Sequence, residues 1–349
     1  MNDQQASPTV LVTGASGYLG SWCVVQALER GHQVRASVRN DSRGQELRET
    51  IESRSGSSEG LAVVEADLAS DDGWEDAVRG CDYVLHVASP FPASQPKDPN
   101  ELIVPAREGT LRVLRAALAA GAERVVVTSS VAAVRNFPGP PPDRPIDEQD
   151  WTDPDLPGLS PYSRSKTIAE RAAWDLARER DATERLAVVN PSAILGPLLS
   201  PHRSTSVELV ERLLKGMPGM PRLSFSVVDV RDVAELHLLA MTAPQAAGER
   251  FLAVGPSLWI SDMAEILRDR LGAEGEKVPR RTFPDAFVRL AARFDPSLRS
   301  FTGDLGKQLQ FSHEKAEQRL GWKPRPVADT LVDCATSLLE QRREAPVPA

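Results

Sequence analysis

The sequence predicts an α/β protein built on a doubly wound parallel sheet, with a smaller C-terminal lobe interleaved with it. Apolar runs of strand length alternate with stretches of helical periodicity, which is the pattern of parallel strands joined by crossover helices. The runs are rich in valine and nearly unbroken by polar residues, as expected of strands that helices cover on both faces.

The first 191 residues account for most of the expected sheet. Strands are expected over 9–13, 32–38, 61–68, 82–88, 124–130 and 185–191, and helices over 18–30, over 109–120 and after Pro161. Between 137 and 161, prolines and aspartates exclude regular structure. A loop of this length inside a compact domain is often functional.

Three glycines stand in the stretch "VTGASGYLG", directly after the first strand and before a helix that Gly31 would end. In this setting Gly14, Gly17 and Gly20 let the backbone approach a pyrophosphate, and the helix N-terminus supplies free N–H groups. A plain tight turn is the alternative reading. The context favours a Rossmann-type dinucleotide-binding fold.

The chain after Pro191 predicts the second lobe. We expect the stretches "LSFSVVDVRDVAELHLLA" and "RFLAVG" to return to the main sheet. The predicted dinucleotide-binding domain therefore comprises 1–190 plus about 226–254. The predicted substrate-binding lobe comprises about 191–225 plus 255–349.

Composition restricts the partners and the compartment. The net charge of -8 at pH 7 argues against non-specific binding to nucleic acid or to an anionic membrane. The three cysteines are far apart and lack metal-ligand spacing, which predicts small buried hydrophobes in a reduced, cytoplasmic compartment and no metal site. No signal peptide or membrane span is recognised in the sequence. The oligomeric state is left open between monomer and homodimer.

The end of the second strand indicates the cofactor. An acid that accepts from an adenosine ribose is expected there in NAD-binding proteins, but this strand ends in Val38 and Arg39, with Arg43 one turn later. These arginines predict NADP(H), although solvated surface arginines are the alternative. Asp67 is placed either to accept from the adenine amino group or to cap a helix.

The stretch "YSRSK" supplies the candidate chemistry. Tyr162 and Lys166 share a helix face, and an ammonium about 4 Å from a phenol would lower the phenol pKa by roughly three units. Such a phenol could protonate a carbonyl oxygen as hydride reaches the carbon. The strand "RVVVTSS" ends in Thr128, Ser129 and Ser130, of which the last reaches furthest toward the carboxyl edge of the sheet.

With these motifs in place, the chain resembles the extended short-chain dehydrogenase/reductases, within them the dihydroflavonol and cinnamoyl-CoA reductases and related NADPH-dependent carbonyl reductases. The resemblance runs from about Thr9 to Gly255 through "VTGASGYLGS", "VRASVR", "VLHVASPF", "KDPNELIVPAREGTLRVL", "VVVTSSVAAV", "YSRSK", "VNPSAILGP" and "VDVRDVAELHLLA". It implies Ser130 as the catalytic serine, Tyr162 as the general acid and Lys166 as its tuner and a ribose ligand.

The resemblance also implies a wider cofactor site. Arg39 would meet the 2′-phosphate, Pro191 and Ser192 would lie near the nicotinamide, and Val87 and Ala88 would lie beside the cofactor unless their role is structural. The full predicted cofactor set is Gly14, Ser16, Gly17, Tyr18, Leu19, Gly20, Arg39, Arg43, Asp67, Leu68, Val87, Ala88, Ser89, Thr128, Tyr162, Lys166, Pro191 and Ser192.

Two departures from the family bear on the substrate. The stretch "VAAVRNFPG" replaces the amide or acid with which plant flavonoid reductases hold their substrates, and the cinnamoyl-CoA reductase signature "NWYC" is absent. Flavonoids and CoA thioesters are therefore disfavoured. Three segments beyond the strand ends, 89–91, 131–137 and 192–216, are expected to wall the pocket. The pocket residues expected are Phe91, Val131, Phe137, Leu195 and Leu198, with Arg135 guarding the entrance or gripping a polar substituent.

The sequence thus predicts an NADPH-dependent reductase of an aldehyde or ketone of modest size with an apolar or aromatic part, with Tyr162 as general acid. A sugar-nucleotide epimerase or dehydratase that retains NAD is one alternative, and a non-catalytic NADP-binding redox sensor is another. His86 and His237 are expected to be satisfied core residues. Trp151 is expected to pack, with a place in the pocket wall as the alternative.

Overall fold

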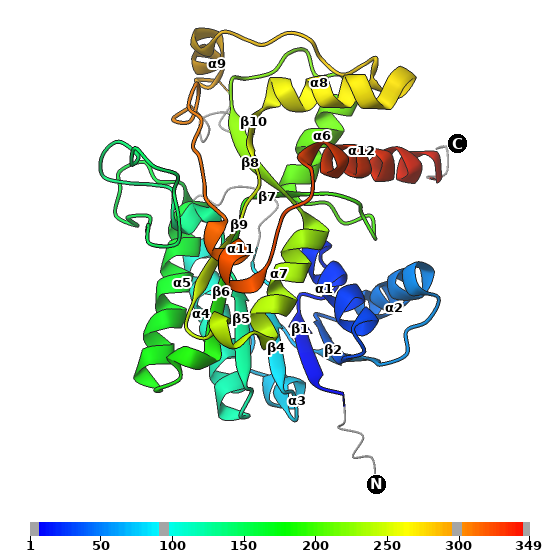
Figure 1. The fold of residues 1–349 in the computed structure, drawn as a ribbon, viewed down its shortest axis with the longest axis vertical. Coiled ribbons are helices and arrows are strands. Elements are labelled where there is room, and N and C mark those ends of the chain that lie inside the picture. Colours follow the sequence, from blue (N-terminus) through cyan, green and yellow to red (C-terminus); the bar gives the residue numbers. More distant parts are fainter. Residues whose placement is uncertain (1–6, 91–97, 295–301, 345–349) are drawn as a thin grey trace.

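In the computed structural model, which describes residues 7–90, 98–294 and 302–344, the chain is organised around a seven-stranded parallel sheet (Figure 1). The strand order is β3-β2-β1-β4-β5-β6-β9, so the chain starts in the middle and changes direction between β1 and β4. Ligands bind at such a switch point, beyond the carboxyl ends of the strands. The strands are β1 (Thr9–Thr13), β2 (Gln33–Val38), β3 (Leu61–Glu65), β4 (Tyr83–His86), β5 (Arg124–Thr128), β6 (Leu186–Pro191) and β9 (Arg250–Ala253).

Helices cover both faces of this sheet, as the valine-rich strands predict. One face packs against α1 (Tyr18–Glu29), α2 (Asp41–Ser55) and α7 (Val230–Thr242). The other packs against α3 (Trp74–Val78), α4 (Asn100–Ala119) and α5 (Pro161–Glu179). The predicted doubly wound α/β fold is therefore confirmed.

A second, smaller sheet forms the other lobe, and its strands β7, β8 and β10 pair in the order β10-β8-β7. Its core is separate from the two cores of the main sheet. The elements of this lobe are β7 (Ala193–Leu195), α6 (Thr205–Lys215), β8 (Ser224–Asp229), β10 (Ser257–Trp259), α8 (Ile260–Leu271), α9 (Asp285–Ala291) and α12 (Val327–Glu344).

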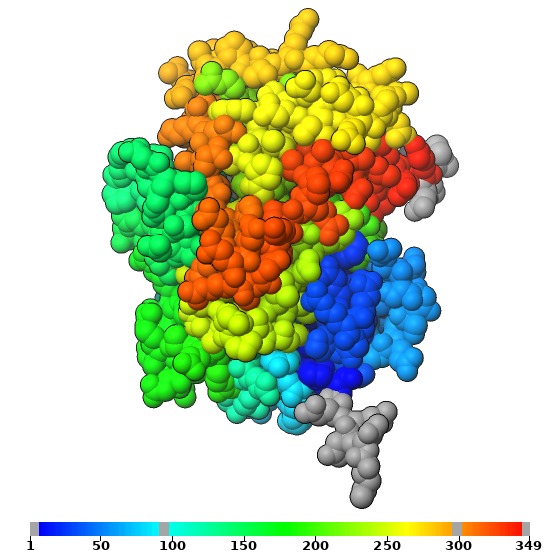
Figure 2. All heavy atoms as spheres, in the orientation of Figure 1, coloured from blue at the N-terminus to red at the C-terminus, as the bar shows by residue number. Residues whose placement is uncertain are grey.

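The C-terminal part of the chain crosses back to the main sheet before it enters α12. Helix α11 (Glu314–Leu320) and the residues after it contribute Ala316 and Trp322 to the core beneath α7. Figure 2 shows this orange segment between the blue helix α1 and the green loop of residues 137–161, called the proline-rich loop below. The two lobes are thus joined by several passages of the chain.

One expectation about the sheet is wrong. The strand β8 in the stretch that begins at Leu223 does not join the main sheet, because it pairs in parallel with β7 and antiparallel with β10. Helix α7, later in the same stretch, does pack against the main sheet. Strand β7 follows β6 almost directly and takes β8 as its neighbour, which leaves the edge of β6 to β9. The two-domain division stays a prediction, and we propose to draw its boundary after Asp229 rather than at about 226.

Helix α4 is longer than expected. It begins at Asn100 rather than at about 109, and it includes Pro105. Pro105 lies in the second turn, where it cannot donate to the carbonyl oxygen of Glu101, and the helix continues through it. The sequence predicts too short a helix here because Pro105 indicates a helix boundary rather than a helix interior.

The burial of the three cysteines agrees with the prediction from composition. Cys23, Cys81 and Cys334 are all buried, as predicted of small hydrophobes. Among the described residues, no helix is long and apolar enough to cross a membrane. Within the same residues, no group of His, Cys, Asp and Glu side chains could hold a metal ion.

The turn between β1 and α1 is closely packed around its glycines. A Cβ atom at Gly20 would lie 2.1 Å from the carbonyl oxygen of Gly14, and one at Gly14 would lie 2.8 Å from the Cα of Ala88. Gly14 also has a φ of 63°, in the left-handed region that glycine favours. Both positions therefore require a residue without a side chain. A plain tight turn would not impose this requirement.

We predict that Gly20→Ala destabilises the protein by about 1–3 kcal/mol, because the new methyl group forces the helix away from the turn. Alanine normally stabilises a helix relative to glycine, so the packing reverses the usual sign. Thermal or urea unfolding measures the effect. Gly139→Ala, where no atom lies within 4 Å of the added Cβ, is the control and should stay within about 0.5 kcal/mol. A stabilised G20A protein would contradict the packing argument.

Candidate active site

The predicted catalytic residues meet at the carboxyl end of β5. Ser130 lies two residues beyond this strand, and its Oγ accepts a hydrogen bond from the backbone N–H of Ala132 at 3.1 Å. The same side chain makes a hydrogen bond with Tyr162. Both side chains are largely removed from solvent, with Ser130 7% exposed. The serine and the tyrosine therefore lie together at this edge of the sheet.

The start of α5 orients the tyrosine. Ser160 caps the helix by accepting from the N–H of Ser163 at 3.1 Å, and Pro161 occupies the first helical position. This cap is a common helix start, because proline lacks the N–H that would be unpaired there. Tyr162 lies in the first turn, and Lys166 lies one turn later on the same face.

The electrostatics of this pair differ from the expectation. Burial raises the pKa of Tyr162, and the hydrogen bond with Ser130 is the contact that lowers it. The predicted lowering by Lys166 is wrong for this structure, because the Lys166 Nζ donates to the carbonyl oxygen of Thr128 at 3.3 Å. Burial lowers the pKa of Lys166 to about 8, opposed by the negative charge of Glu170. The phenol therefore holds its proton at neutral pH, as a proton donor must.

The three hydroxyls after β5 point to three different partners. The Thr128 hydroxyl shares a hydrogen bond of 2.7 Å with His237, on the α7 face of the sheet. Ser129 donates to Glu170 on the α5 face at 2.5 Å, and Ser130 alone of the three meets Tyr162. The hydroxyl of Thr128 is thus bonded within the core. A contact of Thr128 with a cofactor would therefore have to use its main-chain atoms.

The two histidines are satisfied core residues, as predicted. His86 shares a hydrogen bond of 2.9 Å with Thr13, and burial lowers the pKa of His86 to about 3. His237 also contacts the carbonyl oxygen of Val233 at 2.7 Å, and burial lowers its pKa to about 4. Both rings are therefore neutral at physiological pH.

The glycine turn fits a dinucleotide. Helix α1 starts at Tyr18 after the N-cap residue Gly17, which supplies no side-chain cap, and its first turn contains no acidic residue. Its N-terminus therefore presents N–H groups and a partial positive charge. Ser192, beyond the end of β6, has a buried Oγ without a hydrogen-bond partner in the described part of the chain. The absence of Cβ atoms in the turn and this unpaired hydroxyl fit a group with phosphate and amide oxygens.

The glycine turn and the tyrosine site adjoin one another. Ala88 contacts Gly14 and also lines a small cavity together with Ser89, Lys166 and Glu170. Val87 packs against the core, as the structural alternative allowed. Among the other predicted cofactor residues, Ser16 lies in the turn, Leu19 in the first turn of α1 and Pro191 at the end of β6. Leu68 follows β3 and packs against α4 at Gly109.

The arginines after β2 have different surroundings. Arg39 is exposed and has no hydrogen bond or ion pair among the residues that the structure describes. Arg43 pairs with Glu46 at 3.1 Å and also contacts His202 of the smaller lobe. Asp67 accepts from the N–H of Ala69 at 2.9 Å within a turn, and the capping alternative is wrong because α3 begins at Trp74 with Gly73 as its N-cap. Arg39 is the free cation at this edge of the described chain.

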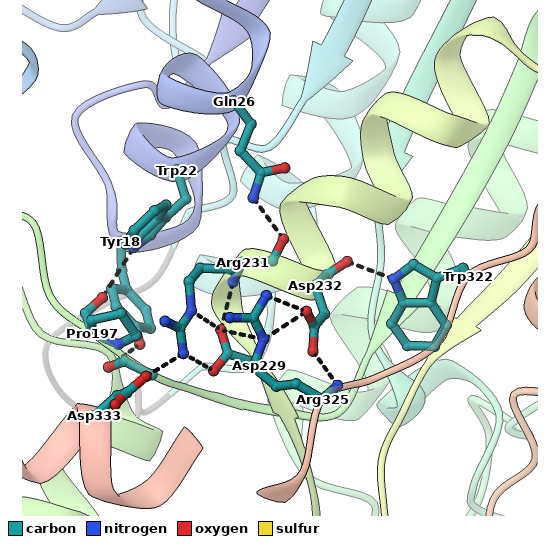
Figure 3. Close-up of polar contacts among 11 residues, drawn as sticks. Tyr18, Trp22, Gln26, Pro197, Asp229, Arg231, Asp232, Trp322, Arg325 and Asp333 are labelled. Atoms are coloured by element: carbon teal, nitrogen blue, oxygen red, sulfur yellow. Dashed lines mark hydrogen bonds and ion pairs between the residues drawn. The ribbon is translucent and has the colours of Figure 1, made fainter. Parts of the chain in front are cut away.

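Tyr18 joins the glycine turn to the smaller lobe (Figure 3). Its hydroxyl donates to the carbonyl oxygen of Gly196 at 2.9 Å, and Trp22 donates to that of Pro197 at 3.0 Å. Burial raises the pKa of Tyr18 well above its ordinary value. Its side chain therefore supports the lobe contact, and any contact with a cofactor is left to its backbone N–H.

A cluster of charges, in which Asp229 and Asp232 are buried and their arginine partners half-buried, lies behind this contact, and the sequence did not reveal it. Arg231 donates to Asp229 at 2.8 Å and to Asp333 of α12 at 2.5 Å. Arg325 donates to Asp232 at 2.8 Å. Figure 3 shows these side chains converging from α7, α12 and the segment before α12. The only sequence signal was the pattern of charges in "VDVRDV", which reads equally well as a solvated helix start.

The predicted substrate residues are only partly brought together. Val131 and Phe137 pack beside the small core formed by Val134, Ile146 and other residues at the end of β9. Leu198 is half-buried against the smaller lobe. Leu195 is 1% exposed inside that lobe, so it belongs to the core and does not wall a pocket. Phe91 lies outside the described residues.

Two further predicted residues have defined partners. Arg135 donates to Asp304 of the smaller lobe at 2.5 Å, which places it between the two lobes. The ring of Trp151 lies under the guanidinium of Arg250, with 3.6 Å between the guanidinium carbon and the ring centroid. Trp151 therefore packs, as predicted, and anchors the proline-rich loop.

Comparisons with known proteins agree with this architecture. Residues 10–255 match the model of the NAD dependent epimerase/dehydratase family. Cinnamoyl-CoA reductase 1 of Arabidopsis thaliana is 35% identical over 98% of this chain and 92% of its own. Cinnamoyl-CoA reductase CAD2 of Medicago truncatula is 38% identical over 77% of this chain and 82% of its own.

A solved structure extends the likeness to three dimensions. The yeast methylglyoxal/isovaleraldehyde reductase Gre2, complexed with NADPH, superposes with a TM-score of 0.79 at 25% identity, covering 97% of this chain and 100% of the other. The predicted resemblance is thereby confirmed. The chain belongs to the NAD dependent epimerase/dehydratase family, the extended short-chain dehydrogenase/reductases.

Proposed function

We propose that the protein reduces an aldehyde or ketone to an alcohol with NADPH, using Tyr162 as general acid. The observation that carries this proposal is the buried hydrogen bond between Ser130 and Tyr162 at the sheet edge where the glycine turn also lies. The predictions of an oxidoreductase and of NADP(H) as cofactor are confirmed by the reductase relatives and by the NADPH complex of Gre2.

The residues present would have the following roles in the reaction. Bound NADPH supplies hydride to the carbonyl carbon. Ser130 and Tyr162 hold the carbonyl oxygen through their hydroxyls, and Tyr162 gives its proton to that oxygen as the carbon–oxygen double bond becomes single. The ammonium of Lys166, which donates to the carbonyl oxygen of Thr128 in this structure, would hold a hydroxyl of the cofactor's ribose. The free cation of Arg39 would hold the 2′-phosphate.

The substrate is proposed to be uncharged, with an apolar or aromatic part. Val131, Phe137 and Leu198 stay in the proposal because they border the sheet edge and are only partly buried. A CoA thioester is the second candidate, since relatives of this chain are named cinnamoyl-CoA reductases, although the signature expected of that group is absent here.

The two earlier alternatives are less well supported. An epimerase that retains NAD would gain from an acid after β2, where Arg39 stands exposed. A redox sensor without turnover has no need of Tyr162 and Lys166, and here Lys166 is buried and Tyr162 half-buried near the carboxyl end of β5. A compartment in the cytoplasm and a monomer or homodimer remain part of the proposal.

We predict that Arg39→Asp raises the KM for NADPH at least about tenfold and changes the KM for NADH less than about threefold. Losing one charge-assisted bond to a phosphate and gaining a like charge account for this size. Initial rates with both cofactors measure it. Arg115→Asp, on the exposed side of α4, makes the same charge change and should leave both KM values unaltered. Equal KM values for the two cofactors in the unmutated enzyme would contradict the assignment.

We also predict that Tyr162→Phe lowers kcat about a hundredfold or more, while NADPH still quenches protein fluorescence with a similar Kd. The proton donor is lost but the binding site is retained. Tyr83→Phe is the matched control, because that hydroxyl donates to Glu123 at the opposite end of β4. Turnover within a few-fold of the unmutated enzyme would remove Tyr162 from the mechanism.

For the substrate, we predict that phenyl aldehydes and ketones have a kcat/KM about ten- to a hundredfold above that of acetaldehyde or acetone, because burying one ring contributes about 1.5–3 kcal/mol. Phe137→Ala should reduce this preference, and Phe287→Ala, on the exposed face of α9, should not. UDP-sugars and cinnamoyl-CoA complete the panel. A preference for the smallest aldehydes or for UDP-sugars would show that the proposed pocket is wrong.

A further inference from the structure

The carboxylate of Glu170 is a buried charge directly behind the candidate active site, and the sequence analysis assigned it no role. Glu170 is 1% exposed and follows Lys166 by one turn of α5. Positions 162, 166 and 170 therefore share one face of the helix. A buried ionised carboxylate is costly unless donors surround it, so its contacts need a physical account.

Three strong hydrogen bonds hold this carboxylate in place. One oxygen accepts from Ser129 at 2.5 Å and from Asn190 at 2.8 Å, and the other accepts from Arg250 at 2.6 Å. Trp174 adds a weaker contact of 3.4 Å. Since every partner is a donor, the arrangement suits the charged form of the carboxylate. The donors come from β6, β9, α5 and the end of β5, so the acid is fixed in relation to the whole sheet edge.

The same acid faces Lys166 across a small cavity. Ser129, Lys166 and Glu170 line this cavity together with Thr128 and Ser89. The charged and titratable groups around Lys166 are Glu170 and Tyr162 on its own helix and the neutral His86 of β4, with Arg250 paired to the far side of the carboxylate. Glu170 is therefore the negative charge that faces the lysine.

Arg250 extends the contact to the proline-rich loop. Its guanidinium stacks on Trp151 and donates to the main-chain oxygens of Glu148 at 3.0 Å and Asp150 at 3.1 Å. The loop, the edge strand β9 and the catalytic helix thus converge on one carboxylate. These contacts alone would give Glu170 a purely structural role. An effect of Glu170 on the charge of Lys166 must therefore be tested separately.

We propose that Glu170 is a positioning residue that keeps Lys166 in its ammonium form for the proposed reaction, an inference that rests on the function proposed above. The geometry assigns this role to the charge of the carboxylate rather than to its volume. Lys166 needs such a partner because burial alone favours the neutral amine. The ammonium form is present below the pKa of Lys166 and is lost as the pH rises through it.

The test uses Glu170→Gln, which keeps the volume and removes the charge. In the unmutated enzyme kcat should fall as the pH rises through about 8. In E170Q this basic limb should move down by about one pH unit, so that kcat falls about fivefold at pH 8 and changes little at pH 6. Glu148→Gln is the matched control, since its carboxylate accepts from the N–H of Leu252 and does not face Lys166.

A second measurement does not depend on turnover. The chain has only seven lysines, so the ¹³Cε signals of labelled lysine can be titrated by NMR in the protein without added cofactor, with Lys166→Met to assign the signal. The Lys166 midpoint should lie near 8 in the unmutated protein and in E148Q, and about one unit lower in E170Q. An unmoved midpoint and an unmoved basic limb would overturn the proposal.

If E170Q does not fold, a double variant replaces it in the test. Removing one partner of a buried pair leaves the other charge unpaired, so E170Q/R250M removes both. The same downward shift in this variant supports the proposal, and an unchanged midpoint overturns it. If the unmutated enzyme reduces no carbonyl compound, the proposed function fails, and the NMR titration still tests the effect of Glu170 on Lys166.

Discussion

Helix α1 can approach strand β1 only because position 20 carries no side chain, and the functional edge of the molecule depends on that approach. The carbonyl oxygen of Gly14 occupies the space that a Cβ of Gly20 would need. The approach points the uncapped N-terminus of α1 toward the switch point of the sheet. It also brings the Tyr18 hydroxyl to the carbonyl oxygen of Gly196, which joins the turn to the smaller lobe.

Buried charge is the second theme of the structure, and it occurs behind both functional elements. Behind the glycine turn, Arg231 bonds to the buried Asp229 at the start of α7 and to Asp333 of α12 in the smaller lobe. Behind the tyrosine, Glu170 and Arg250 link α5 to β9 and to the proline-rich loop. Ion pairs of this kind contribute little net stability, because desolvation offsets their attraction. Their effect is instead to fix the direction in which neighbouring groups present charge.

The sheet and the catalytic residues were predictable from local patterns. Valine-rich runs mark strands that are covered on both faces, and the spacing from Tyr162 to Lys166 is a property of any helix. The switch point then places the ends of β1, β4 and β5 at one edge, so Ser130 and Tyr162 had to meet there.

What could not be predicted depends on long-range packing. The partner of β8 was missed because its alternation fits either sheet, and only the course of β7 decides between them. Leu195 reads as a pocket residue until the core of the smaller lobe encloses it. The expected effect of Lys166 on Tyr162 was wrong because spacing along a helix does not show where the ammonium is directed, which here is the Thr128 carbonyl. Glu170 was missed because a glutamate on a helix normally faces water.

The central claim is that the sheet edge around Ser130, Tyr162 and Ser192 directs hydride from NADPH to a carbonyl carbon. The most direct measurement uses NADPH deuterated at C4, in separate (4R) and (4S) forms, with a phenyl aldehyde, and analyses the alcohol by mass spectrometry. We predict that one form delivers a single deuterium to the carbinol carbon and that the other delivers none. Oxidation of NADPH with no deuterium in the alcohol from either form, or interconversion of UDP-sugars without net change in the cofactor, would contradict the account.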